Sequence, residues 1–182
     1  MADLLTHGCV ALLAGLAAGL RERGDLAVLV AGSCVPDLFG QVPGLALIRV
    51  RATWPAIPEP LIYLFSPLHL PSGLVVLNYA LAHGFAPPER FRVFGLLTAG
   101  GFLHLAVDLL QSHFGVGYML FFPFTRWDWE AGLVGTEATV KVAPVLLLLT
   151  AGLTWWLRRR RVRGPGAGTL SPGAPAESGG AG

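Results

Sequence analysis

The chain has 182 residues, of which 53% are hydrophobic and only 13% are charged. Soluble domains carry about 25% charged residues, so this composition excludes a typical soluble globular protein and, over most of the length, a disordered one. The formal net charge of +2 is too small to indicate nucleic acid as a partner. The composition is typical of a small all-α integral membrane protein, with membrane lipids as its surroundings.

Five apolar segments predict a transmembrane bundle of about four or five helices. They cover residues 4–20, 25–39, 67–84, 91–112 and 141–157, and charges or Pro/Gly clusters separate them. A spanning helix needs about 20 residues, so the fourth segment is long enough, whereas the second and fifth are short. The four prolines between 43 and 60 exclude one long helix over 40–66. We therefore predict a helical membrane domain over 1–157.

Two segments after the fourth apolar helix, 113–130 and 158–182, have unusual compositions. Seven aromatic residues between 113 and 130 predict a loop along the membrane interface, because Trp and Tyr concentrate at headgroup level. The basic run Arg158–Arg161 is followed by a tail of mostly Gly, Pro, Ala and Ser. Residues 158–182 are therefore predicted to be a basic stop and a disordered tail.

The distribution of basic residues predicts an orientation. If all five segments cross, nine basic residues lie on the side of loops 21–24 and 85–90 and of the tail, and four lie on the other side. The positive-inside rule then places the N-terminus outside and the C-terminus in the cytoplasm. The expected location is the inner membrane of the cell.

Few ionisable residues lie inside the apolar segments, where they are costly and mark functional sites. The candidates are His7, Asp37, His69, His104 and Asp108. Each has a structural explanation when taken alone, such as a histidine near a helix end or an aspartate in a turn. At a rise of about 1.5 Å per residue, however, all five fall near one outer level, which favours a shared site.

His104 and Asp108 are the sharpest pair among these candidates. Their spacing of four places both side chains on one helical face, and imidazole and carboxylate are good ligands for zinc, manganese or iron. A catalytic metal site needs about three protein ligands and an open position, and His7, Asp37 and His69 would supply the remaining ligands. Alternatively, Asp108 accepts a proton from His104 and orients its imidazole.

The order of several short motifs resembles that of a known family. The motifs are Thr6-His7-Gly8, Gly32-Ser33-Cys34-Val35-Pro36-Asp37, Ser66-Pro67-Leu68-His69-Leu70-Pro71-Ser72, the Gly-x-x-x-His-x-x-x-Asp run from Gly100 to Asp108, Gly115-Val116 and Phe122-Pro123-Phe124. In this order they resemble the inner-membrane-associated, LexA-binding family of membrane-bound metal-dependent hydrolases. Phe39 stands where many relatives carry a second acid, and the His-Arg pair that precedes their Thr-His-Ser motif is absent. Nothing in these motifs implies LexA binding.

The residues and the resemblance together predict a membrane-bound metal-dependent hydrolase. One divalent metal, with zinc as first choice, would be held among the five candidates, and Asp37 would act as the base. A site at the interface favours an amphiphilic substrate such as a phospholipid or lipid-linked ester. The alternative is a non-catalytic membrane protein whose His/Asp cluster holds helices together or relays protons.

Overall fold

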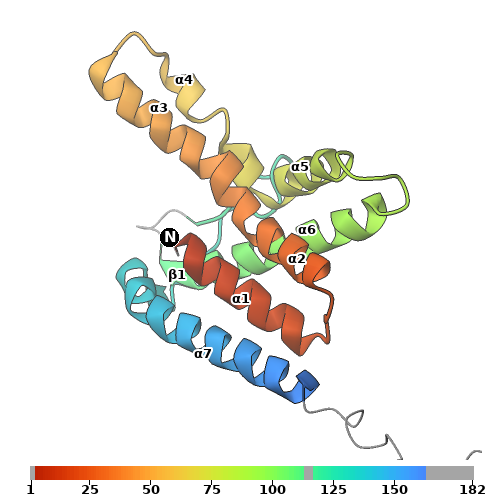
Figure 1. Cartoon of the computed structure of the whole chain (residues 1–182). Helices are drawn as coiled ribbons and strands as arrows, with labels where there is room; N and C mark the ends of the chain where they lie inside the picture. The colour runs from red at the N-terminus through yellow and green to blue at the C-terminus, as the bar shows by residue number, and fades with distance from the viewer. Residues whose placement is uncertain (1–2, 113–116, 163–182) are drawn as a thin grey trace, which may run out of the picture. The chain divides into compact units, whose positions relative to one another are not determined.

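The computed structural model describes residues 3–112 and 117–162, and these are mostly helical (Figure 1). The chain forms two compact units, Met1–Thr150 and Ala151–Gly182, and every candidate site residue belongs to the first. The elements are α1 (Leu4–Ala17), α2 (Arg23–Val35), the π-helical turn η1 (Pro36–Gln41), α3 (Val42–Thr53), α4 (Glu59–Ile62), the 3-10 turn η2 (Ser66–His69), α5 (Pro71–Ala82), α6 (Arg90–Leu109), the strands β1 (Gln111–Ser112) and β2 (Val134–Gly135), and α7 (Thr136–Val162). The tail predicted to be disordered falls largely on residues outside this description.

One continuous helix runs through α2, η1 and α3, from Arg23 to Thr53 (Figure 1). The prediction that this apolar segment ends at residue 39 is therefore wrong. Pro36 has no N–H for an α-helical bond, and the chain widens into a π turn, in which the Val42 amide donates to the Asp37 carbonyl. The helix ends at Thr53, just before the Trp54–Pro55 pair.

The apolar stretch 67–84 is not one straight helix. The 3-10 turn Ser66–His69 leads into α5, which covers only Pro71–Ala82. The helical stretches on the two sides of this break are bent by 78°. Prolines in the first turn of both η2 and α5 explain the break, since neither can continue a preceding helix.

Two helices of the described chain are long and apolar enough to cross a membrane, Arg23–Thr53 and Arg90–Leu109. A third span results if the bent pair Glu59–His69 and Pro71–Ala82 counts as one. The apolar helices Leu4–Ala17 and Lys141–Leu157 are shorter, and α7 continues beyond the predicted end at residue 157 to Val162. Four or five crossings are therefore not confirmed, and the orientation that depended on five of them stays a prediction.

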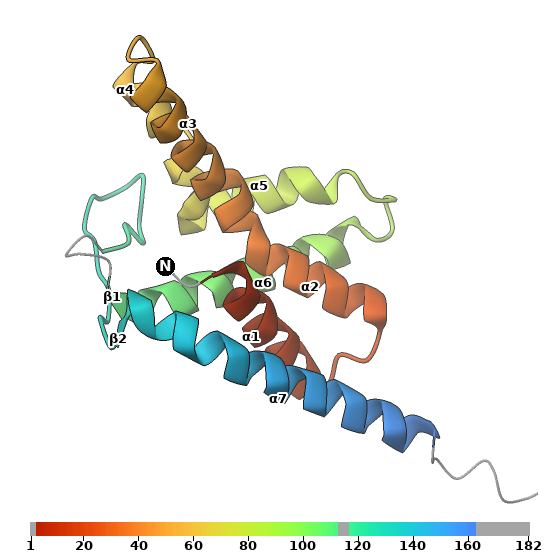
Figure 2. The ribbon, with the colours of Figure 1, turned by 60° about the vertical axis from the view of Figure 1, so that its left-hand side comes forward.

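Helices α2 and α6 run side by side in the same direction (Figure 2). At their starts, Arg92 pairs with Glu22 and Asp25. Further along the two helices, the backbones approach so closely that a Cβ on Gly100 would lie 2.1 Å from the Leu29 carbonyl oxygen. A Cβ on Gly32 would likewise lie 2.3 Å from the Leu97 carbonyl oxygen. Such approaches between membrane helices require glycine.

The loop after α6 folds back onto the end of that helix. Ala131 and Val134 donate backbone hydrogen bonds to the carbonyls of Leu109 and Leu110. Across the loop, the backbones of Tyr118 and Trp129 form an isolated antiparallel bridge. Phe124 is 93% exposed, and the predicted position of this loop at a membrane interface remains untested.

We expect Gly100→Ala to lower the free energy of unfolding by about 1–3 kcal/mol, because the added Cβ forces α2 and α6 apart. The measurement is thermal or denaturant unfolding in detergent. Gly95→Ala is the matched control, since a Cβ there meets nothing within 4 Å. It should be neutral or stabilise by up to about 1 kcal/mol through helix propensity. Equal effects of the two changes would contradict the close packing.

Candidate metal centre

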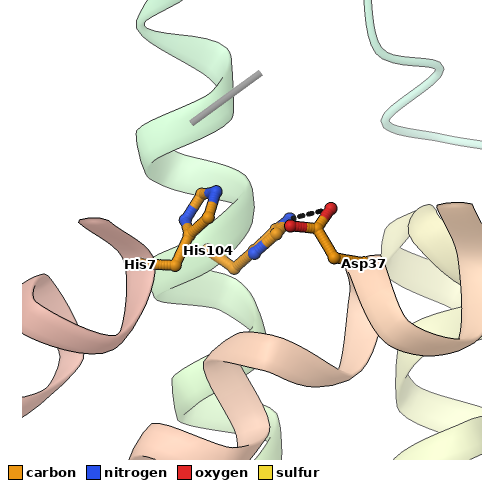
Figure 3. A group of neighbouring side chains, drawn as sticks. All are labelled: His7, Asp37 and His104. Atoms are coloured by element: carbon orange, nitrogen blue, oxygen red, sulfur yellow. Dashed lines mark ion pairs between the residues drawn. The ribbon is translucent and has the colours of Figure 1, made fainter. Parts of the chain in front are cut away.

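The structure brings all five candidate residues into one buried cluster. His7 comes from α1, Asp37 from η1, His69 from η2, and His104 and Asp108 from α6. None of the five is more than 8% exposed, and His104 and Asp108 are completely buried. Figure 3 shows His7 and Asp37 reaching toward His104 from separate helices. We refer to these five residues as the His/Asp cluster.

The carboxylate of Asp108 is the hub of the cluster. Its Oδ2 lies 3.1 Å from Nε2 of His69 and 3.2 Å from Nε2 of His104. Its Oδ1 lies 3.3 Å from Nε2 of His7. This contact lacks the geometry of a hydrogen bond, and within the described part of the chain both buried ring nitrogens of His7 have no hydrogen-bond partner. Three imidazoles from three different elements therefore face one buried carboxylate.

The backbone of α2 orients the ring of His104. Nδ1 of His104 lies 2.8 Å from the carbonyl oxygen of Ser33, and because a carbonyl only accepts, Nδ1 must carry a proton. In the neutral ring, Nε2 then presents a lone pair to Oδ2 of Asp108 and to Nε2 of His69, which is 3.3 Å away. Lone pairs that face one another in a buried site require a proton or a cation between them.

Asp37 lies at the edge of the cluster. Its Oδ1 is 3.7 Å from Nε2 of His104, the ion pair drawn in Figure 3, and 3.8 Å from Nδ1 of His69. These separations are too long for hydrogen bonds, and Oδ1 of Asp37 is buried without a hydrogen-bond partner among the described residues. Asp37 belongs to the π turn η1 inside the continuous helix Arg23–Thr53 and does not lie at the end of a helical segment.

The spacing of the cluster suits a metal ion. In a tetrahedral site with bonds of about 2.0–2.1 Å, neighbouring ligand atoms lie about 3.3 Å apart, close to most of the separations just given. Two overlapping groups each bring three ligand atoms within 4.8 Å of one another: His7, Asp37 and His104, and His69, His104 and Asp108. The hydrogen bond from His104 to a backbone carbonyl is also typical of a metal-binding histidine. These buried groups could hold a metal ion, but their mutual contacts do not identify which one.

Two further residues belong to the site and were not predicted from the sequence, Gln111 and Tyr118. The hydroxyl of Tyr118 donates to Oδ2 of Asp108 over 2.7 Å and lies 3.3 Å from Nε2 of His69. The side-chain amide of Gln111, which is almost completely buried, donates weakly to Oδ1 of Asp108 over 3.4 Å. Gln111 follows Asp108 by three residues, so helical spacing could have indicated it. Tyr118 comes from a loop, where no periodicity points to it.

The environment of Tyr118 keeps its hydroxyl protonated. Burial and the negative charge of Asp108 raise the pKa of Tyr118 well above its usual value. The hydroxyl therefore acts as a hydrogen-bond donor to the carboxylate at all physiological pH values.

Two residues near the motifs lie apart from the cluster. Phe39, at the position of the second acid of the resembling family, is 41% exposed. His83, at the C-terminal end of α5, bonds through Nδ1 to the Tyr79 carbonyl. His83 therefore offers a control for substitutions of the buried histidines.

We expect Tyr118→Phe to destabilise the protein by about 1.5–3 kcal/mol, because it removes a buried hydrogen bond to a charged acceptor. The readout is thermal unfolding in detergent. Tyr79→Phe, at a ring that is 59% exposed on α5, controls for the loss of a tyrosine hydroxyl and should change little. A neutral Tyr118→Phe would contradict the contact with Asp108.

No protein-family model, curated protein or solved structure matches this chain. The resemblance to the membrane-bound metal-dependent hydrolases therefore depends on the short motifs alone.

Proposed function

We propose that this protein is a membrane-bound metal-dependent hydrolase that acts on an amphiphilic ester at the membrane interface. The observation that carries the proposal is the set of buried imidazole and carboxylate atoms at ligand spacing, with the lone pair of His104 turned toward Asp108. Such an arrangement needs a proton or a cation at its centre, and a divalent metal would supply the cation. Zinc is the first choice because two or three imidazoles and a carboxylate form a typical zinc ligand set.

The residues of the cluster divide into two roles. Asp108, His104, His69 and His7 make the closest mutual contacts, and they would hold the ion. When bound, the metal polarises an ester carbonyl and activates water. Asp37 is the base, because its Oδ1 has no hydrogen-bond partner and the imidazoles stand 3.7 Å or more away from it. It accepts the proton of the attacking water at that oxygen.

The parallel direction of α2 and α6 supports a particular path through the membrane. If two helices cross in the same direction, the chain between them must cross back once. The bent pair Glu59–His69 and Pro71–Ala82 is the apolar segment that lies between them. We therefore assign this pair as a broken return span, with Arg92, Glu22 and Asp25 meeting on one side. The abundance of basic residues near that side favours the cytoplasm.

Metal analysis of the purified protein tests the proposal. We expect close to one equivalent of zinc after purification without chelators, and a loss of most of it in His104→Ala. His83→Ala is the matched control, since its ring bonds to the Tyr79 carbonyl and stands outside the cluster. The control should retain the metal of the unmodified protein.

The proposal would be contradicted if the intact protein contained no bound metal under these conditions and also bound none after incubation with zinc. The non-catalytic alternative predicts a different pattern. In that case His104→Ala lowers detergent stability while zinc neither binds nor raises the melting temperature, because a protonated imidazole provides the central charge.

Asp37→Asn separates the base from the ligands. We expect it to retain metal and lower kcat for ester hydrolysis by about 10²–10⁴-fold, the usual contribution of a general base. Metal content and hydrolysis are measured on the same preparation. Loss of metal together with activity would show instead that Asp37 is a necessary ligand.

A further inference from the structure

A cavity of about 350 Å³ adjoins the His/Asp cluster, a size typical of small-molecule sites. His69 and Tyr118 line it, and both contact Asp108. The cavity therefore reaches the cluster at these two side chains. Its other walls come from η1 and α3, from the stretch between Ile62 and Leu70, and from the loop around Met119. We call this cavity the α3 groove.

Glycines leave one wall of the α3 groove without side chains. Gly40 and Gly44 lie one helical turn apart, and both line the cavity. A Cβ on Gly40 would lie 2.9 Å from Cβ of His69, and one on Gly44 would lie 3.3 Å from the Ile62 carbonyl oxygen. The groove is therefore narrow, and its width is set by the backbone.

The lining of the groove matches hydrocarbon rather than a charged group. Five of its lining side chains are apolar, Leu45, Ile48, Ile62, Leu70 and Met119, and the polar ones outside the cluster, Gln41, Tyr63, Ser66 and Tyr118, are uncharged. No Asp, Glu, Lys or Arg of the described residues lines it. A lipid headgroup or a charged metabolite would find no ionic partner along its length.

The outer part of the groove is open on a helix suited to lipid surroundings. Leu45 and Ile48 are 52% and 49% exposed, and both lie on the helix Arg23–Thr53, which is long and apolar enough to cross a membrane. The groove meets the His/Asp cluster at His69 and Tyr118, which contact Asp108. The groove thus joins an apolar exterior to a polar centre.

We propose that the α3 groove binds the acyl chain of a long-chain carboxylic ester and places its carbonyl beside His69 and Tyr118. The inference rests on the proposed hydrolase function and specifies its substrate class. In the reaction, water adds to the carbonyl carbon and the bond to the alkoxy oxygen breaks. The fatty acid keeps the hydroxyl of the water, and the alcohol leaves with the remaining proton.

The groove contributes positioning more than affinity. A chain that moves from the bilayer into an apolar groove gains little hydrophobic free energy, because lipid tails are as apolar as the groove. Holding the carbonyl in one place relative to the cluster lowers the barrier by proximity. Blocking the groove should therefore alter selectivity for chain length and leave short esters unaffected.

Ile48→Trp tests this selectivity, with p-nitrophenyl acetate and p-nitrophenyl palmitate as probes and the protein in lipid nanodiscs. We expect kcat/KM for the palmitate to fall by about tenfold or more, with little change for the acetate. Val50→Trp, on the same helix but outside the groove lining, is the matched control and should affect neither ester. Equal changes for both esters in Ile48→Trp, or no change in either, would overturn the inference.

A second variant distinguishes a blocked groove from a misfolded protein. A binding measurement tests the groove even if the protein hydrolyses neither ester. Leu45→Trp, at an exposed position of the same lining, should act in the same way. A photoreactive palmitic acid in the nanodisc should label residues 44–48, 62 and 119, and both variants should reduce this labelling. Label at exposed Val76 on α5 should persist.

The two readouts separate the proposals. Labelling of the groove in a protein that neither binds zinc nor cleaves either ester supports the chain site and rejects the hydrolase. Zinc-dependent cleavage of the palmitate without labelling of the groove, and without an effect of either variant, rejects the chain site and leaves the hydrolase standing.

Discussion

The buried negative charge of Asp108 is the constraint on which the rest of the structure depends. A carboxylate with no access to water is strongly unfavourable unless donors or cations surround it. Here His7, His69 and His104 approach it, and the hydroxyl of Tyr118 donates to it. These partners come from four separate parts of the chain, so burying this one charge requires most of the first unit to assemble around it.

The packing of α2 against α6 is what makes this assembly possible. Because Gly32 and Gly100 remove side chains from the contact, the two backbones approach within reach of one another. The same approach delivers the Ser33 carbonyl to the ring of His104. The two glycines therefore also affect the chemistry of His104. The close packing that they allow brings the Ser33 carbonyl to Nδ1, which fixes the proton on that nitrogen and turns Nε2 toward Asp108.

The sequence predicted the members of the cluster better than the elements that carry them. Scarcity of polar groups in an apolar chain singled out the five residues, and the spacing of His104 and Asp108 indicated a shared helical face. Segment ends were less predictable. The run of prolines that begins at Pro43 suggested a boundary near residue 39, whereas a π turn allowed the helix to continue.

Other parts of the site could not be read from periodicity. Tyr118 reaches Asp108 from an irregular loop, whose path depends on backbone hydrogen bonds to the end of α6 and across to Trp129. The bend between η2 and α5 likewise turns one apolar stretch into two short helices. Among the described residues two helices, or three spans if the bent pair counts as one, are long and apolar enough to cross a membrane, and the predicted four or five are not confirmed. Tertiary contacts decide the path of the loop, whereas the local effect of Pro67 and Pro71 decides the bend.

The π turn at Pro36–Gln41 also affects how changes in chain length are transmitted along this helix. Each residue of an α-helix advances the direction of the side chains by about 100°, so one residue added to a regular helix rotates every side chain beyond it by that amount. A π turn contains one residue more than the α-helical turn it replaces and absorbs that residue locally, so the direction of the side chains beyond it is kept. Deletion of one residue within Pro36–Gln41 would therefore restore a regular helix and leave the bare face of α3 toward Ile62, whereas a deletion within α2 would rotate that face away. Natural variation in length should thus be tolerated in the π turn and avoided in the regular helix on either side.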